Sequence, residues 1–229
     1  MTLDAVTDRA ARNRIIVEAA VETVDSALAA EHAGADRLEL CADLANGGTT
    51  PGLELIDAVS AATRLPVQVM VRPRAGNFVY SDREIALMTK DIELISARNP
   101  SGIVTGVIRS DAKLDTPNMK LLLTAAGTTP VTFHRAFDRL ANPIDALDPL
   151  VELGVARVLT SGGSPTASEG LEQLAAMVKR AAARITILAG GGVRAHNVRE
   201  ILARTGVREV HARFVDYAQM KALVVAARD

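Results

Sequence analysis

Ionisable side chains stand at the ends of several short apolar runs in this chain. The run at residues 131–133 (Val-Thr-Phe) leads directly into His134, Arg135 and Asp138. Carboxylates and imidazoles gathered at one place can transfer protons to and from a polar substrate, or they can bind a divalent metal ion. Four of these run ends supply the candidate catalytic residues Glu18, Glu39, His134 and His211.

Arginines and glycine-rich segments follow other runs and could hold an anionic group. Guanidinium groups bind carboxylates and phosphates through paired N–H donors. Glycine-rich loops late in a barrel commonly leave backbone N–H groups open to phosphate, although the same glycines also permit simple tight turns. The candidate anion-binding residues are Arg72, Arg74, Ser161, Gly162, Gly190, Gly191 and Gly192.

Cys41 is the single cysteine, so the chain has no intramolecular disulfide framework and no multi-cysteine zinc site. Its thiol is a candidate ligand for a soft metal ion. A Cu(I) site usually needs two or more thiolate or thioether ligands, and Met70 is expected deeper on the same face. The simpler interpretation is that Cys41 is a small buried apolar residue.

Strand and helix signals alternate eight times along the chain. Helix starts are indicated by Thr50 before Pro51 and by the capping-box spacing of Ser81 and Glu84, and helix ends by glycines such as Gly34. Eight such units predict a (β/α)8 TIM barrel forming a single domain over residues 14–229, after a flexible N-terminal tail at residues 1–13. The alternative is a doubly wound sheet, which would favour a G-x-G-x-x-G turn after the first strand. The predicted strands cover residues 14–18, 36–41, 66–72, 102–108, 131–138, 157–160, 184–188 and 208–211.

Side chains alternate along each strand, which assigns them either to the helix layer or to the barrel interior. Leu38 and Leu40 are expected against the helices, and Arg135 is expected to point toward the helix layer or a loop. A polar layer is predicted near the C-terminal rim, where barrels build their sites. An alternative is a structural ion-pair network that only plugs the barrel mouth. The residues predicted inside are Glu18, Glu39, Cys41, Arg72, His134 and His211.

The bulk composition excludes several classes of protein. The 229 residues are 48% hydrophobic and 23% charged, which is typical of one globular domain with a large core. A formal net charge of −1 argues against a nucleic-acid partner. No apolar run approaches the roughly 20 residues that span a bilayer, and the polar start lacks a secretory core, so we expect no membrane partner and a cytoplasmic location.

Three stretches carry a family resemblance: residues 36–41 (Asp-Arg-Leu-Glu-Leu-Cys), 69–74 (Val-Met-Val-Arg-Pro-Arg) and 130–138 (Pro-Val-Thr-Phe-His-Arg-Ala-Phe-Asp). Together with further motifs in the same order, they make the chain resemble the CutC family of copper homeostasis proteins. The resemblance implies a (β/α)8 barrel, a cytoplasmic location, a homodimer or higher homo-oligomer, and copper as a possible ligand.

The chain departs from the family pattern in two places. Ala20 stands where many members have a second cysteine that has been discussed as a copper ligand, which weakens copper binding through thiolates. The stretch His211-Ala212-Arg213-Phe214 lacks the Gly-Ser of the usual eighth strand and most of the loop after it.

Two functions therefore remain as hypotheses. One is a CutC-like cytoplasmic role in copper homeostasis, with copper ion binding. The other is an enzyme with lyase-like or isomerase-like acid–base chemistry on a small anionic or phosphorylated metabolite, although the sequence assigns no reaction. A metal-free scaffold with a structural polar mouth is the third possibility.

Overall fold

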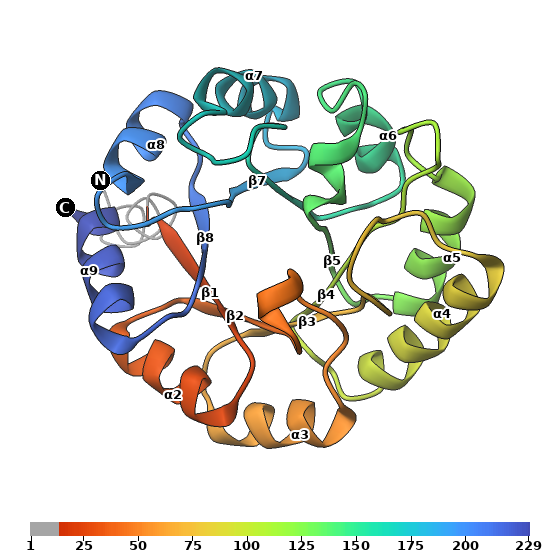
Figure 1. Cartoon of the computed structure of the whole chain (residues 1–229), viewed down its shortest axis with the longest axis horizontal. Helices are drawn as coiled ribbons and strands as arrows, with labels where there is room; N and C mark the ends of the chain where they lie inside the picture. The colour runs from red at the N-terminus through yellow and green to blue at the C-terminus, as the bar shows by residue number, and fades with distance from the viewer. Residues whose placement is uncertain (1–13) are drawn as a thin grey trace, which may run out of the picture.

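The structure, a computed structural model, describes residues 14–229, and the predicted tail lies outside them. Eight parallel strands close into a barrel in chain order, with β1 paired to both β2 and β8 (Figure 1). The (β/α)8 prediction is confirmed, and the closed sheet excludes the doubly wound alternative. The strands are β1 Ile16–Val21, β2 Arg37–Leu40, β3 Val67–Met70, β4 Gly102–Thr105, β5 Val131–Phe133, β6 Arg157–Thr160, β7 Thr186–Ala189 and β8 Glu209–Arg213.

Helices alternate with the strands and form an outer ring around the barrel (Figure 1). Two 3-10 helices, η1 Leu44–Asn46 and η2 Arg135–Arg139, lie in the loops that follow β2 and β5. Within the described residues no helix has the length and apolarity needed to cross a membrane. The α-helices are α2 Val24–Ala33, α3 Leu53–Ala62, α4 Asp82–Ser96, α5 Thr116–Ala126, α6 Leu147–Glu152, α7 Leu171–Ala181, α8 Val198–Thr205 and α9 Tyr217–Arg228.

Local capping chemistry explains most helix ends. The predicted capping box of Ser81 and Glu84 is present at the start of α4, and Gly34 ends α2 in the left-handed conformation at φ 95°. The predicted N-cap at Thr50 is wrong, because α3 begins after Gly52. The Thr50 hydroxyl instead bonds the backbone of Arg72, which joins the loop after β2 to the end of β3.

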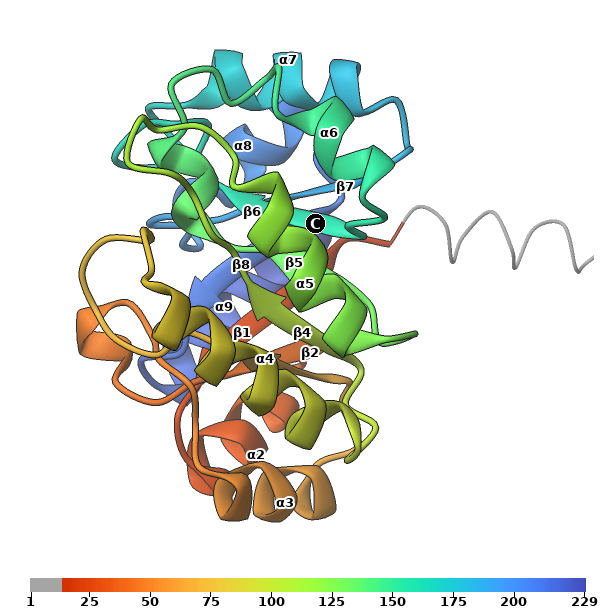
Figure 2. The ribbon, with the colours of Figure 1, turned by 90° about the vertical axis from the view of Figure 1, so that its right-hand side faces the viewer.

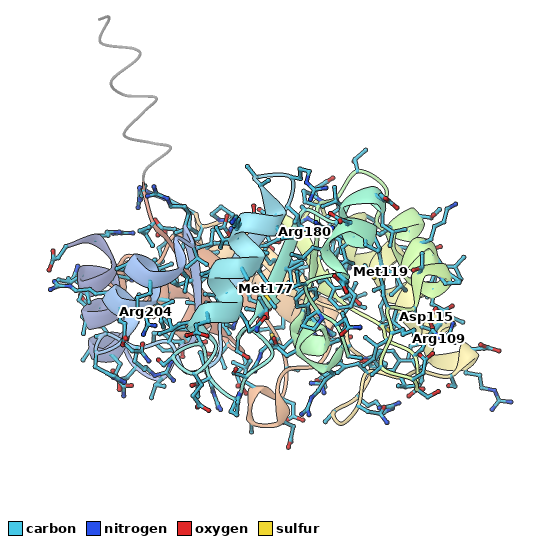
Figure 3. The ribbon with its side chains drawn as sticks, turned by 90° about the horizontal axis from the view of Figure 1, so that it is seen from above. Arg109, Asp115, Met119, Met177, Arg180 and Arg204 are labelled. Atoms are coloured by element: carbon cyan, nitrogen blue, oxygen red, sulfur yellow. The ribbon has the colours of Figure 1, made fainter. Side chains whose placement is uncertain are left out.

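The apolar core lies between the strands and the helices. Met119 of α5 and Met177 of α7 are fully buried there, whereas Arg180 and Arg204 on the outer helix surfaces are exposed (Figure 3). Outward-facing strand residues such as Leu38 meet these helices in one continuous apolar cluster, as alternation predicted. Burial of this surface is the main stabilising term of the fold.

The barrel interior is polar, in contrast to the layers of branched apolar side chains that fill most TIM barrels. Buried charged or polar side chains enter it from β1, β2, β3 and β5, and the half-buried Glu209 and His211 enter it from β8. In the side view of Figure 2 the loops after the strands, with η1 among them, gather at one end of the barrel. The buried polar side chains include Glu18, Arg37, Glu39, Gln68, Thr132 and His134.

Candidate functional site

A chain of ion pairs crosses the floor of the barrel interior. Glu18 of β1 accepts from Arg37 of β2, and Arg37 Nη2 lies 2.5 Å from Glu209 Oε2 of β8. Arg157 of β6 donates to the same Glu209 oxygen at 2.8 Å. Buried charges are costly unless they are paired, so these contacts explain how the interior tolerates them. They also show that Arg37 and Arg157 pair with these carboxylates. The alternation of side chains along the strands had not identified either arginine as an interior residue.

His211 of β8 joins this network to the cavity above it. Its Nδ1 lies 2.8 Å from Glu18 Oε1, and its Nε2 lies 3.8 Å from Glu39 Oε2. Burial opposes ionisation of Glu18, but Arg37 and His211 outweigh it and lower the pKa of Glu18 to about 2. Since an ionised carboxylate only accepts hydrogen bonds, Nδ1 carries the proton and Nε2 is left facing Glu39.

Burial governs the protonation of Glu39 as well. It raises the pKa of Glu39, and this effect outweighs the attraction of His211. Burial lowers the pKa of His211, but the Glu39 and Glu18 charges outweigh it and the pKa is raised. The Oε1 atom of Glu39 is buried and has no hydrogen-bond partner. Glu39 and His211 are thus poised to share a proton or to hold a cation between them.

His134, at the end of β5, is 3% exposed and neutral near pH 7. Burial, reinforced by the charge of Arg72, lowers its pKa to about 3. Its Nδ1 accepts the N–H of Ala136 at 3.3 Å, so the ring proton is on Nε2, which is buried without a partner. Phe78 covers the ring with 4.8 Å between centroids. A neutral imidazole held in this way can donate a hydrogen bond to a ligand oxygen.

Arg72 and Arg74 have different environments, although both were predicted to bind anions. Arg72 lies at the barrel mouth, where its Nη atoms donate to the carbonyls of Gly48 and Gly76 at 2.9 Å. Its Nε is buried and unpartnered. Arg74 pairs with Glu84 at 2.5 Å and lines neither of the two cavities described below. Of the two, only Arg72 is placed to meet a ligand.

The loop after β6 already binds an anionic side chain of the protein, the carboxylate of Asp138. The carboxylate of Asp138, from η2, accepts the N–H groups of Ser161 at 3.1 Å and Gly163 at 3.0 Å. It also accepts the hydroxyl of Thr160 at 2.5 Å, and Gly162 N–H goes to that hydroxyl oxygen at 2.9 Å. The donors that were expected to cradle phosphate at Ser161 and Gly162 are therefore engaged within the chain.

The loop after β7 has backbone N–H groups that are not hydrogen-bonded within residues 14–229. Gly190 N–H is used in the sheet, where it donates to the carbonyl of Thr160 at 2.9 Å. Gly191 and Gly192 have positive φ angles of 98° and 75° and line the inner cavity described below. Among residues 14–229 their N–H groups have no hydrogen-bond acceptor. Of the predicted glycine cradles, this is the one that can still receive an anion.

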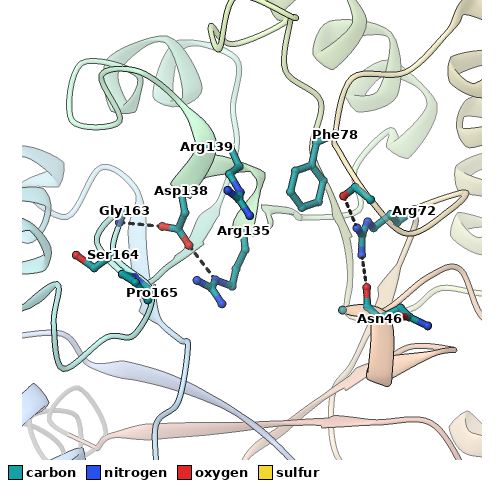
Figure 4. A pocket seen from close by; sticks show the side chains of 11 residues that line it. Asn46, Arg72, Phe78, Arg135, Asp138, Arg139, Gly163, Ser164 and Pro165 are labelled. Carbon is teal, nitrogen blue, oxygen red and sulfur yellow. Dashed lines mark hydrogen bonds and ion pairs between the residues drawn. The ribbon is translucent and has the colours of Figure 1, made fainter.

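Two neighbouring cavities, which share three lining residues, open at this end of the barrel. The outer cavity, of about 640 Å³, is bordered by Arg72, Arg135 and Arg139 (Figure 4). The inner cavity, of about 240 Å³, lies beneath it and reaches Glu39, His134 and His211. Both are lined by Gly47, Phe78 and Arg135, so a ligand held by the outer arginines can extend to the acid–base groups.

Arg135 lines both cavities and its guanidinium reaches the loop after β6, which agrees with the loop alternative of the prediction and not with the helix layer. After Phe133 the backbone leaves the strand and turns into η2, so strand alternation no longer applies. The guanidinium is held by Asp138 at 2.8 Å (Figure 4). It is also held by the Ser161 hydroxyl at 2.8 Å. Arg139, one turn further along, was missed by sequence reasoning. The spacing i, i+4 from Arg135 in a short turn could have indicated it.

Cys41 lies on the interior side, as predicted, and is fully buried. It packs with Met70 and Val104 in a small cluster apart from the main core. Burial, with the nearby charge of Glu39, raises the pKa of the thiol well above its usual value. The thiol donates to Glu39 Oε2 at 3.4 Å. It is therefore a protonated thiol, and its surroundings hold one other sulfur side chain.

Comparison with known proteins relates the whole barrel to one family. The model of the CutC family matches residues 15–215. A human copper homeostasis protein cutC homolog is 42% identical over 201 residues, covering 88% of this chain and 74% of that protein. A CutC family protein of Salmonella paratyphi B is 45% identical over 197 residues, covering 86% and 79%.

Solved structures agree with this relationship. A CutC crystal structure from Streptococcus agalactiae superposes with a TM-score of 0.84 at 35% identity, covering 88% of this chain and all of that one. A phosphoribosylanthranilate isomerase from Thermotoga maritima, at 12% identity and a TM-score of 0.60, shares the fold alone. On its sequence, its closed eight-stranded barrel and these matches, the chain belongs to the CutC family.

Proposed function

We propose that the two cavities bind a small anionic organic molecule and carry out acid–base chemistry on it. One observation carries this proposal. Glu39 Oε1 and His134 Nε2 are buried, have no partner, and belong to side chains that line the same inner cavity. Buried polar atoms are nearly always hydrogen-bonded in folded proteins, so an unpaired acceptor and an unpaired donor facing one cavity indicate a polar ligand.

The charges around the mouth favour an anion. Arg72, Arg135 and Arg139 border the outer cavity, and Arg194 and Arg213 border the inner one. Asp138 balances Arg135, but the other four guanidinium groups form no ion pair among residues 14–229. A phosphate or carboxylate would meet them as charge-assisted hydrogen bonds, which are stronger than neutral ones. The open N–H groups of the β7 loop add further donors.

The deeper residues supply the chemistry in this proposal. Glu39 and His211 exchange a proton with the ligand, and Glu18 keeps His211 in the tautomer with Nδ1 protonated. His134 donates from Nε2 to a ligand oxygen and stabilises negative charge that develops there. This division of roles suits a lyase-type or isomerase-type reaction, in which a proton moves next to a polar group.

Phosphate binding by calorimetry tests the anion part of the proposal. Inorganic phosphate and glycerol 3-phosphate are the probes, with the Arg139→Gln variant and the exposed Arg83→Gln as its matched control. We expect the loss of one guanidinium contact to weaken binding roughly 10- to 100-fold, while the control stays unchanged. Absence of binding in the wild-type protein, or equal binding in both variants, would rule out the anion site.

A second role, in copper homeostasis, is favoured by the names of the relatives. We propose that the chain acts in copper homeostasis without a Cu(I) site built on thiolates. Cys41 is a protonated thiol, Met70 is the other sulfur side chain in its cluster, and Ala20 brings none. A Cu(I) titration against a competing chelator tests this. Affinity that falls in Cys41→Ala would restore the thiol as a copper ligand.

We also propose, from the family resemblance, a cytoplasmic location and a homodimer or higher homo-oligomer. Cell fractionation tests the location. Light scattering coupled to size-exclusion chromatography tests the assembly, and a mass of one chain at micromolar concentration would contradict it.

A further inference from the structure

Three side chains of types that can bind a metal ion lie close together at the inner cavity and directly behind its wall. Glu18, Glu39 and His211 each offer one ligand atom, and the three atoms lie within 4.8 Å of one another. We propose that a divalent transition-metal ion binds here, coordinated by Glu39 and by Nε2 of His211, with Glu18 positioning the histidine. This inference rests on the proposed function for the existence of an anionic substrate. It adds a metal ion as the group that would activate that substrate.

The orientation of His211 is that of a metal ligand. Histidines that bind metals almost always donate their other ring N–H to a carboxylate or a carbonyl, which sets the tautomer. Here Glu18 accepts from Nδ1 at 2.8 Å, so Nε2 presents its lone pair toward Glu39. Glu18 itself is held by Arg37 and does not line the cavity, which suits a positioning residue better than a direct ligand.

The spacing of Glu39 and His211 also fits a shared ion. Their closest atoms are 3.8 Å apart, too far for a hydrogen bond. Two ligands at roughly 2.1 Å from one metal ion are about 3.4 Å apart at a tetrahedral angle and about 4.2 Å apart when opposed. The observed separation lies between these values. The second oxygen of Glu39 is buried and unpartnered, so the carboxylate has an unused acceptor beside this gap.

The network on the barrel floor holds more carboxylates than guanidinium groups. It contains Glu18, Glu39 and Glu209 against Arg37 and Arg157, with the imidazole of His211 between Glu18 and Glu39. With His211 neutral and bound through Nε2, a divalent ion would supply the positive charge that a protonated His211 otherwise provides. Two protein ligands leave the other coordination positions open to the inner cavity, where an anionic substrate would complete them, as occurs at many sites for hard divalent ions.

Imidazole and carboxylate together select the kind of ion. Imidazole suits zinc, copper(II), iron and nickel, whereas carboxylate also suits manganese and magnesium. A bound ion of this kind lowers the pKa of a coordinated water molecule and polarises a substrate oxygen. With the ion bound, Glu39 and His211 would act as its ligands, and the coordinated water would take over from them the exchange of a proton with the substrate.

Calorimetric titration of tag-free protein with Zn²⁺, and separately with Mn²⁺, tests the site at pH 7.5. We expect one ion per chain and at least tenfold weaker binding in Glu39→Gln and in His211→Gln. The controls are two exposed histidines away from the cavity, changed in His32→Gln and His196→Gln. Both controls should bind like the wild type, and thermal unfolding of each variant establishes that it is folded.

Three results would overturn the metal site. They are no binding of either ion up to millimolar concentration, full binding in a folded Glu39→Gln variant, and a loss confined to one of the controls. A phosphate titration of Glu39→Gln separates this inference from the proposed function. If phosphate still binds through the arginines while Zn²⁺ does not bind the wild type, only the metal site fails. If Zn²⁺ binds and phosphate does not, the anion site fails.

Discussion

His134 should make the stability of this protein depend on pH in a way that one substitution removes. Its imidazole is buried beside Arg72, so its pKa in the folded state falls from 6.5 to about 3. In the unfolded chain the ring is exposed and titrates near its ordinary value. Below about pH 6.5 the unfolded state therefore binds a proton at this ring, and the folded state does not. The free energy of unfolding consequently decreases as the pH falls from 6.5 toward 3.

The size of this loss of stability depends only on the pKa of His134 in the unfolded chain over most of the range from pH 6.5 to 3. At pH 5 the unfolded ring lies about 1.5 pH units below its pKa of 6.5, while the folded ring stays neutral. At about 1.36 kcal/mol per unit, the unfolding free energy should fall by roughly 2 kcal/mol between pH 7.5 and pH 5 because of His134. The same fall in stability is expected for any folded pKa below about 4.

Urea unfolding at pH 5, 6 and 7.5 measures this contribution. In His134→Asn the asparagine oxygen can still accept the N–H of Ala136, but no proton is taken up. We expect this variant to be less stable at every pH, with a change between pH 7.5 and 5 about 2 kcal/mol smaller than in the wild type. Exposed His196→Gln is the control, and the other titrating groups are shared. Equal pH dependence in the wild type and His134→Asn would refute the reasoning.

Three further substitutions test other contacts by urea unfolding at pH 7.5. Glu18→Gln should cost about 3–5 kcal/mol, because Arg37 loses one of its two carboxylate partners and His211 loses the charge that Nδ1 faces, and a loss under 1 kcal/mol would contradict these pairings. Gly106→Ala should cost about 1–3 kcal/mol, because a Cβ there would lie 2.7 Å from His134 Nδ1, and an unchanged protein would show that the ring can move. Asp138→Asn should cost about 1.5–3 kcal/mol through its charge-assisted bonds to the β6 loop, and a stabilised variant would contradict this.

Local patterns were sufficient for the fold and for much of the interior. Alternation along β2 placed Glu39 and Cys41 inside and Leu38 outside, because a strand sends successive side chains to opposite faces. Capping chemistry located the start of α4, since its hydrogen bonds join residues three apart. The prediction failed at Thr50, whose hydroxyl bonds Arg72 across 22 residues.

The candidate site was predicted in part. His134 and Glu39 lie at the inner cavity as expected, and Arg72 lies at its mouth. Arg74 lies outside both cavities, because it pairs with Glu84 of α4, a contact that depends on how the loop after β3 packs against this helix and not on position in a strand. Arg139 was overlooked, because it lies beyond the end of β5, where alternation gives no direction.

By itself, the sequence determined the eight strand-and-helix units, the inward positions of Glu18, Glu39 and His211, and the family of the chain. These properties depend on residue types and on spacings within one element. Only the tertiary structure decided which of those charges meet. Closure of the barrel places β8 beside β1, so His211 contacts Glu18, 193 residues away in the chain. The turn of η2 places the Asp138 carboxylate where it accepts a backbone N–H group of the loop after β6. Contacts of this kind arise from the path of the whole chain, which no local pattern encodes.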